Sequence, residues 1–396
     1  MKKKLKVGLI IALSLLVFIT IILFVLFINE LKTLKSLKQI DSYGMYRMTY
    51  YGDYGFDDFL EQGAASDKDI EEFVTKRLLK GIPIKFNVTD SGCTAFVTKN
   101  ENEDIIFARN FDFIYAPSMQ LYTNPLNGYA SVSTVNLAFA GYSEDNLPTK
   151  GVSFNNFLTL AAPYLPFDGM NEKGVAIALL AVPEVQLRND ENKITLNTTT
   201  AIRLVLDKAS NVDEAIELLK NYNIYFSGDV YCHYLIADST GKSVIVEYYD
   251  NDLQVVETDK EYQVASNFIA YNGLNIGEGY TEFDRYDRVI NKIEDSNNSL
   301  NMNDTINLLN DVGVYGENGI DKLQWSVIYN LSNMSGKIWA HRNENNIMDF
   351  EWEKTYGKDN ERQDKRSVLE LLKNPPEKTI DYQPQGTVKS KDRGAR

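Results

Sequence analysis

Along most of the 396-residue chain, apolar and polar residues follow one of two periods, that of strands or that of helices. Apolar runs bounded by polar turns predict strands near residues 45–51, 94–97, 120–123, 129–139, 175–182, 230–237 and 243–249, with a closing pair at 324–329 and 338–341. Helical spacing predicts helices over 67–79, 154–164, 199–209, 212–222 and 281–294. The mixture predicts an α+β fold.

The longest apolar run lies near the start of the chain. Residues 7–28 are 22 positions without a charge, enough to cross a bilayer, and four lysines precede them. No small-residue cleavage site follows, so the run predicts an uncleaved transmembrane anchor rather than a signal peptide. We therefore expect a cytoplasmic tail over 1–6, a single-pass anchor over 7–28 in the cell membrane, and an extracytoplasmic body.

The distribution of charge argues against one class of partner. Residues 1–40 contain seven lysines and one glutamate, so the remainder carries a net charge of −20 against −14 for the whole chain. Such an acidic body argues against a nucleic-acid partner. Two cysteines, Cys93 and Cys232, do not make a disulfide framework. A single bridge between them outside the cell would disable Cys93 as a nucleophile.

Residues 91–113 carry the candidate chemistry. Cys93 begins an apolar strand, residues 99–104 have the composition of a hairpin loop, and the returning strand ends with Arg109 and Asp112 beside Cys93. A guanidinium near a thiol lowers its pKa and favours the nucleophilic thiolate. A nearby aspartate is suited to hold a cation such as a free α-amine. A lone cysteine at a strand start is also commonly a small buried hydrophobe, so the residues alone leave both interpretations open.

This stretch resembles the choloylglycine hydrolase family of linear-amide C–N hydrolases, which includes bile salt hydrolases and penicillin V acylases. Cys93 is followed by Thr94, and Arg109 and Asp112 stand at the spacings of that family. The resemblance continues through the Asn-Glu-Lys-Gly turn at 171–174 to about residue 350. It implies a four-layer αββα N-terminal-nucleophile hydrolase domain over 93–373, preceded by a linker and pro-segment over 29–92. We expect a disordered tail over 374–396.

The resemblance implies roles around the thiol. Cys93 would be the N-terminal nucleophile, with its own α-amine as general base. It would be released when its thiol attacks the Gly92 carbonyl and the Gly92-Cys93 bond breaks. Arg109 and Asp112 would steady the thiolate and the amine.

Three further positions follow from the same resemblance. Asn267 would aim its side-chain amide at the oxyanion of the tetrahedral intermediate. Arg285 would lie at the active site, and Arg288, one helical turn later on nearly the same face, is the fallback. The family carries an asparagine on the strand after the 171–174 turn, whereas this chain has Ala181. That departure leaves the second oxyanion donor unassigned.

The hypothesis from sequence is therefore an amidohydrolase that cleaves a small-molecule linear N-acyl amide through a thioester on Cys93, without cofactor or metal. The acyl group, the amine and homo-oligomer formation stay open. One alternative is a papain-like enzyme using Cys93, His233 and Asn267, although the flanking signature of that family is missing. Another is an inactive membrane-anchored binding domain of the same fold, for which Ala181 is the best support.

Overall fold

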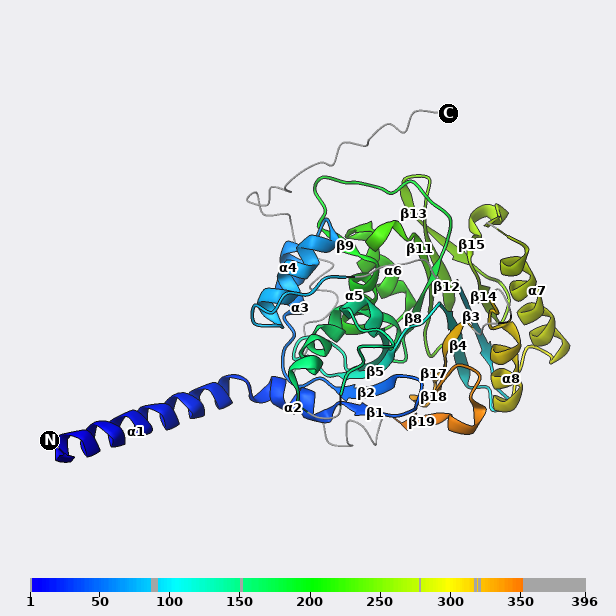
Figure 1. Ribbon diagram of the computed structural model, residues 1–396. Helices are drawn as coiled ribbons and strands as arrows, with labels where there is room; N and C mark the ends of the chain where they lie inside the picture. The colour runs from blue at the N-terminus through cyan, green and yellow to red at the C-terminus, as the bar shows by residue number, and fades with distance from the viewer. Residues whose placement is uncertain are drawn as a thin grey trace, which may run out of the picture.

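Two stacked β-sheets form the centre of the molecule, and helices cover their outer faces (Figure 1). This computed structural model describes residues 2–86, 92–149, 152–277, 279–316, 319 and 322–351. The tail expected over 374–396 lies outside the described residues. The layers follow the order helix, sheet, sheet, helix, which is the αββα arrangement that the resemblance implied.

The larger sheet has nine strands. In spatial order they are β1 (Lys38–Gln39), β2 (Met45–Thr49), β5 (Ser118–Thr123), β6 (Ser131–Asn136), β7 (Pro166–Asn171), β8 (Ala176–Ala181), β11 (Cys232–Ala237), β12 (Ser243–Tyr249) and β13 (Asp252–Glu257). Neighbouring strands are antiparallel except β2 and β5, which run parallel. The helices α5 (Thr198–Lys208) and α6 (Val212–Lys220) pack on its outer face.

The smaller sheet has six antiparallel strands. In spatial order they are β14 (Gln263–Ala265), β3 (Gly92–Lys99), β4 (Ile105–Asp112), β17 (Leu323–Asn330), β18 (Ser335–Ala340) and β19 (Met348–Glu351). Its outer face is covered by α7 (Tyr280–Asp295) and α8 (Met302–Val312). Two short pairs lie outside the main sheets: β9 (Thr195–Asn197) with β10 (Asn223–Tyr225), and β15 (Phe268–Ile269) with β16 (Ile276–Gly277).

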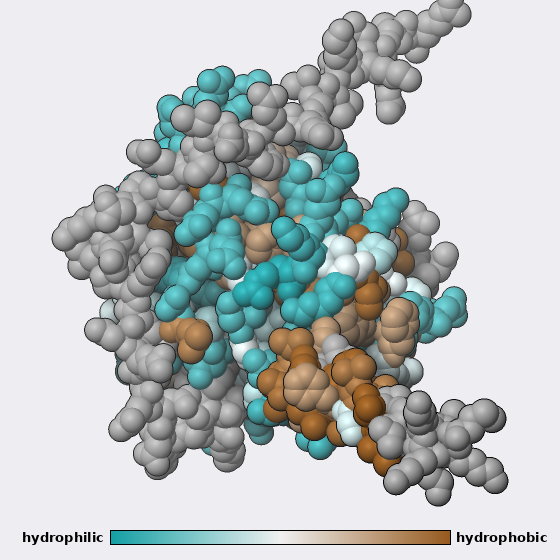
Figure 2. All heavy atoms as spheres, turned by 90° about the vertical axis from the view of Figure 1, so that its left-hand side faces the viewer, coloured by the Kyte–Doolittle hydropathy of each residue, from teal (hydrophilic) through white to brown (hydrophobic). Residues whose placement is uncertain are grey.

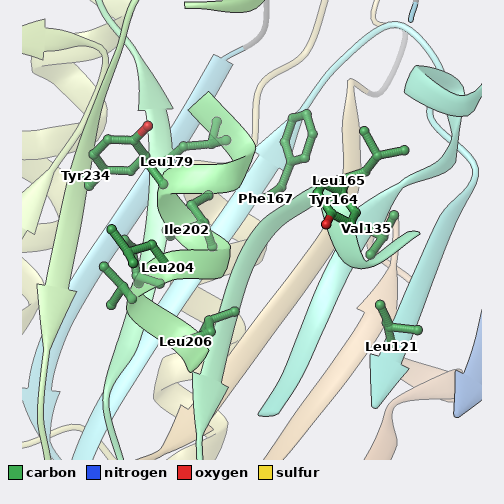
Figure 3. Close-up of a cluster of buried hydrophobic side chains, with 14 of the residues drawn as sticks. Leu121, Val135, Tyr164, Leu165, Phe167, Leu179, Ile202, Leu204, Leu206 and Tyr234 are labelled. Carbon is green, nitrogen blue, oxygen red and sulfur yellow. The ribbon is translucent and has the colours of Figure 1, made fainter. Parts of the chain in front are cut away.

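The central strands β7 and β8 of the larger sheet are enclosed by other layers. Every residue of β7 and β8 is buried, as expected for strands between a helix layer and a second sheet. Figure 3 shows Phe167 of β7 and Leu179 of β8 in one buried cluster with Ile202 and Leu206 of α5. On the other side, β8 packs against β3 of the smaller sheet, which carries Cys93.

Residues 28–86, most of the predicted linker and pro-segment, belong to the same core. They form α2 (Ile28–Ser36), β1, β2, α3 (Phe56–Gln62) and α4 (Asp67–Arg77), whose apolar side chains join the core of the two sheets. The strand and the helix predicted here are both present, and the Ser66 hydroxyl caps α4 by accepting the Asp69 N–H. Tyr54 donates a hydrogen bond of 2.6 Å to Asp207 Oδ2 on α5, and both side chains are buried.

The apolar run at the start of the chain is not the continuous span of 7–28 that the sequence predicts. One residue separates α1 (Lys2–Leu26) from α2. The chain turns onto the body at α2, because Leu34 and Leu37 are buried there. Among the described residues no single helix meets the length and apolarity needed to cross a membrane. The pair Leu13–Leu26 and Ile28–Ser36, bent by 62°, meets them by length and composition alone. On the face from which α1 projects, the largest apolar patch lies at the lower edge (Figure 2), in keeping with the exposed apolar side chains of α1.

Candidate active site

The hairpin of β3 and β4 divides the candidate residues between two faces of the smaller sheet. Cys93 lies opposite Phe111, and Arg109 lies opposite Ala95, so Cys93 and Arg109 share the face toward the larger sheet. Asp112 lies opposite Gly92, on the face toward the helices. The alternation of side chains along a strand therefore places the Arg109 guanidinium on the same face as the Cys93 sulfur. It places the Asp112 carboxylate on the opposite face. The predicted hairpin is confirmed.

Arg109 contacts the sulfur of Cys93 directly. Its Nη2 lies 3.1 Å from Sγ, and its Nη1 donates to Asp168 Oδ2 at 2.7 Å. The guanidinium also reaches the carbonyl oxygens of Phe167 and Leu179, so it occupies the place where β7 and β8 separate. Arg109 and Asp168 are fully buried. A guanidinium in this position is charged and held on three sides by protein acceptors.

Burial decides the ionisation of Cys93 in the uncleaved chain. Desolvation raises the pKa of the Cys93 thiol above its ordinary value, while the Arg109 guanidinium opposes that rise and the Asp112 carboxylate adds to it. The sequence-based expectation of a lowered pKa is therefore wrong for the chain with its Gly92-Cys93 bond intact. The reason is that Cys93 has no exposed surface there.

A second set of polar groups surrounds the backbone of Cys93. The Cys93 N–H donates to Asn267 Oδ1 at 2.7 Å, and Arg285 Nη2 donates to the same oxygen at 2.8 Å. Arg285 Nη1 donates to the Cys93 carbonyl oxygen and to Thr94 Oγ1, each at 2.7 Å. Arg285, which is 2% exposed, thus fixes Asn267 and the start of β3 together. The fallback Arg288 instead pairs with Asp284 and Asp311 away from Cys93.

The two carboxylate oxygens of Asp112 differ in their hydrogen bonding. Its Oδ1 accepts the Val314 N–H at 2.9 Å, whereas its buried Oδ2 has no hydrogen-bond partner among the described residues. Arg285 Nη1 lies 3.7 Å from Oδ2. Burial raises the pKa of Asp112 to about 6, against the lowering effect of Arg285. A buried carboxylate oxygen without a donor is costly, and a new cation beside Cys93 would satisfy it.

Ala181 brings its backbone rather than a side chain to the site. Its carbonyl oxygen accepts a hydrogen bond of 2.8 Å from Asn267 Nδ2. The next pair along β8 and β11, Val182 with Tyr231, is hydrogen-bonded, since the Val182 N–H donates to the Tyr231 carbonyl. Because antiparallel pairs alternate, Ala181 and Cys232 form a non-hydrogen-bonded pair, and the Ala181 N–H points away from β11 on the same side as its carbonyl.

A pocket of about 310 Å³ opens beside these residues. Its apolar lining comes from Phe113, Ile114, Ala181, Val182, Pro183 and Val314, and its polar lining from Asp112, Asn267, Thr281, Glu282, Arg285 and Lys322, with Gly92 at its wall. The pocket is therefore amphipathic. It can accept a molecule that carries an apolar part and a polar part. Among the described residues no cluster of three or more His, Cys, Asp or Glu side chains is arranged to hold a metal ion.

In the described chain, the other two sequence candidates have partners other than the thiol of Cys93. His233 Nδ1 lies 2.9 Å from Glu247 Oε1, so its ring is paired with a buried carboxylate rather than with Cys93. Cys93 and Cys232 are both free thiols, and the bridge considered from sequence is absent from the described chain. The Cys/His arrangement of a papain-like enzyme is therefore not present around Cys93.

Sequence reasoning missed three residues that support the site. Asp168 binds Arg109, and Thr94 binds Arg285. Glu247 accepts the N–H groups of Ala270 and Tyr271 at 2.9 Å each, which fixes the segment just after Asn267. For Asp168 and Glu247 the signal in the sequence was a charged residue inside a predominantly apolar segment, because such residues are buried only when paired.

The chain is similar in sequence to known proteins. A model of the linear amide C–N hydrolases, choloylglycine hydrolase family, matches residues 93–306. The chain is 29% identical over 209 residues to the bile salt hydrolase/transferase of Clostridium perfringens, covering 47% of this chain and 59% of that protein. It is 33% identical over 111 residues to the penicillin V acylase of Pectobacterium atrosepticum, covering 25% and 29%. Both alignments span less than two thirds of these relatives.

A solved structure extends the likeness to the fold. A mutant of the conjugated bile acid hydrolase of Clostridium perfringens superposes with a TM-score of 0.50 at 21% identity, covering 68% of this chain and 95% of that chain. The stacked sheets and the cysteine at the start of β3 thus place the molecule in the mixed α/β class to which that structure belongs. Because the family model covers more than half of its residues, the chain belongs to the choloylglycine hydrolase family of linear amide C–N hydrolases.

Proposed function

We propose that the chain is an N-terminal-nucleophile amidohydrolase that cleaves a linear N-acyl amide through a thioester on Cys93, after self-cleavage of the Gly92-Cys93 bond. The observation that carries the proposal is the environment of the Cys93 nitrogen. Asn267 Oδ1 accepts its proton at 2.7 Å, and the unpartnered Asp112 Oδ2 lies in the same buried space. These two acceptors are suited to a free ammonium group, which only cleavage before Cys93 creates.

The acylation step follows from this placement. The Cys93 α-amine takes the thiol proton, and Sγ attacks the amide carbon of the substrate. The resulting ammonium is held by Asp112 and Asn267 and gives its proton to the leaving amine as the C–N bond breaks. Arg109 stabilises negative charge on the sulfur before attack. Water then hydrolyses the thioester, with the same amine accepting a proton from the water.

Two donors are available for the oxyanion of the tetrahedral intermediate. Asn267 Nδ2 uses one hydrogen for the Ala181 carbonyl and has a second one free to donate. The Ala181 N–H, which points away from β11, is the other donor in this proposal. A backbone donor would compensate for the asparagine that the resemblance led us to expect at this position. Loss of one oxyanion donor commonly costs ~3 kcal/mol of transition-state stabilisation.

The amphipathic pocket supports an amide with an apolar acyl group and a polar amine part, or the reverse. We further propose that residues 29–92 stay bound after cleavage, since residues 28–86 supply two strands of the larger sheet. We also propose that α1 anchors the chain in the cell membrane with the body outside. Its exposed apolar side chains and the four lysines at its start support this placement.

The decisive experiment measures cleavage and turnover on the same protein. Intact mass of the purified full chain should show a fragment beginning at Cys93, and the protein should hydrolyse at least one member of a panel of N-acyl amides, bile salt conjugates and penicillin V. Cys93→Ala should show neither cleavage nor hydrolysis, while the matched thiol variant Cys232→Ala should show both. Turnover by Cys93→Ala would refute the proposal.

A further inference from the structure

A buried chain of charges runs from the sulfur of Cys93 across the space between the two sheets. Arg109 on β4 contacts Sγ with one nitrogen and Asp168 on β7 with the other. Asp168 Oδ2 also accepts Trp325 Nε1 at 3.1 Å, and its Oδ1 accepts the Tyr329 hydroxyl at 2.6 Å. Both donors come from β17. Residues of three strands, β4, β7 and β17, thus meet at one fully buried carboxylate.

We infer that Asp168 is a positioning residue that holds the Arg109 guanidinium against the Cys93 sulfur and moderates its charge. The inference rests on the proposed function, because it assigns Asp168 a part in preparing the same nucleophile. A guanidinium has five donors in a fixed plane, so an anchor on Nη1 also sets where Nη2 points. The two β17 donors hold the carboxylate in turn, and the plane of Arg109 therefore has one orientation.

The charge of Asp168 has a definite electrostatic effect on the sulfur. The groups that face Cys93 are Arg109 and Asp112 from β4 and Arg285 from α7, and Asp168 lies behind Arg109. A carboxylate there partly cancels the guanidinium, which makes the thiolate less stable but more nucleophilic. The Trp325 and Tyr329 donors limit this cancellation, because they share the negative charge of Asp168 with Arg109.

Asp168→Asn separates the charge from the geometry. The amide oxygen can take the place of Oδ2 and keep Arg109 and Trp325, while the amide nitrogen donates to the Tyr329 oxygen. The variant removes one negative charge and leaves the guanidinium in place. We therefore expect the Cys93 thiol to ionise at a pH lower by about one unit.

The chain contains a matched control in a different layer. Asp207 on α5 is also buried, and it also accepts from one arginine, Arg203, and from one tyrosine, Tyr54. Asp207→Asn removes the same charge from the same kind of pair, but its partners lie outside the candidate site. Any loss of stability that is common to buried ion pairs will appear in both variants.

The test is a pH titration of thiolate absorbance on the full chain, in which each protein is compared with the same protein carrying Cys93→Ser. Asp168→Asn should lower the midpoint, and Asp207→Asn should leave it unchanged. Tyr329→Phe should raise the midpoint, because Asp168 then directs more of its charge at Arg109, while Tyr54→Phe should not move it.

Either of two results would overturn the assignment. One is an unchanged or raised midpoint in Asp168→Asn. The other, which decides the matter if Asp168→Asn does not fold, is an unmoved midpoint in Tyr329→Phe. The titration measures ionisation and needs no turnover, so it stands apart from a failure of the proposed hydrolysis.

Discussion

The two arginines at the site form hydrogen bonds with different atoms of Cys93. Arg109 contacts the sulfur, and Arg285 contacts the carbonyl oxygen. Asp112 is the exception, because one of its two carboxylate oxygens accepts no hydrogen bond from any described residue. Burying charge in this way is unfavourable unless every group is paired. The site therefore contains a destabilising group, which the proposed cleavage would relieve by creating an ammonium group at Cys93.

Asp112 makes a prediction about pH at the scale of the residue. Its pKa in the folded, uncleaved chain is raised to about 6 from 3.8, so the folded state binds more protons than the unfolded state between these values. The uncleavable variant Cys93→Ala should consequently gain about 3 kcal/mol of stability as the pH falls from 7 to below 4, relative to Cys93→Ala/Asp112→Asn. Chemical denaturation at a series of pH values measures the difference. Parallel profiles for the two proteins would contradict it.

At the scale of the element, α7 delivers one of two similar arginines to the site. Arg285 is buried and bonded to Asn267, Thr94 and the Cys93 carbonyl, whereas Arg288 forms surface ion pairs. The two positions differ by less than a turn, and the packing of α7 on β3 and β14 decides between them. In this packing Arg285 reaches Cys93, and Arg288 stays partly exposed.

The two arginines should therefore respond differently to the same substitution. Arg285→Met should lower kcat by about 100-fold, because Asn267 loses the donor that orients it as an oxyanion group. Arg288→Met removes only exposed ion pairs, which contribute at most about 1 kcal/mol, so turnover should stay near that of the unmodified chain. Steady-state kinetics on the same substrate compare them. Equal losses in both variants would show that Arg285 acts only through folding.

At the scale of the whole molecule, the segment before Cys93 is an integral part of the folded structure. β2 pairs with β5, and the apolar side chains of α3 and α4 are buried in the common core. Without this segment, β5 would expose an unpaired edge and the core would lose one wall. The proposed cleavage thus cuts the chain without separating its parts.

A chain that begins at Cys93 should accordingly fail to fold when it is produced alone. Co-expression with residues 29–92 as a separate chain should restore a soluble complex, because the missing strand and helices are then supplied. Size-exclusion chromatography with mass analysis of the peak tests this outcome. Recovery of a stable, monodisperse protein from the shorter chain alone would refute the structural role.

The proposed anchor is also tested on the whole molecule. If α1 holds the chain in the membrane with its body outside, protease added to intact cells should degrade the body, and deletion of residues 1–27 should release the protein from the membrane fraction. Cells expressing a cytoplasmic marker control for leakage. Full protection of the body in intact cells would reject this orientation.

The sequence by itself determined the hairpin and its three candidate residues. Cys93, Arg109 and Asp112 lie within one strand-turn-strand unit, and the strand period alone predicts which face each one occupies. The helices α4, α5, α6 and α7 were likewise predictable, because apolar periodicity and capping residues are local signals.

Only the tertiary structure decided the partners that come from distant strands and layers. Asp168 reaches Arg109 across the gap between two sheets, and the backbone of Ala181 faces the site because of its pairing with β11. Residues 29–92 were predicted as a linker and pro-segment, but the place of β2 in the larger sheet depends on its pairing with β5, far along the chain. Such contacts leave no period in the sequence, since they depend on how whole layers pack and not on the residues next to them.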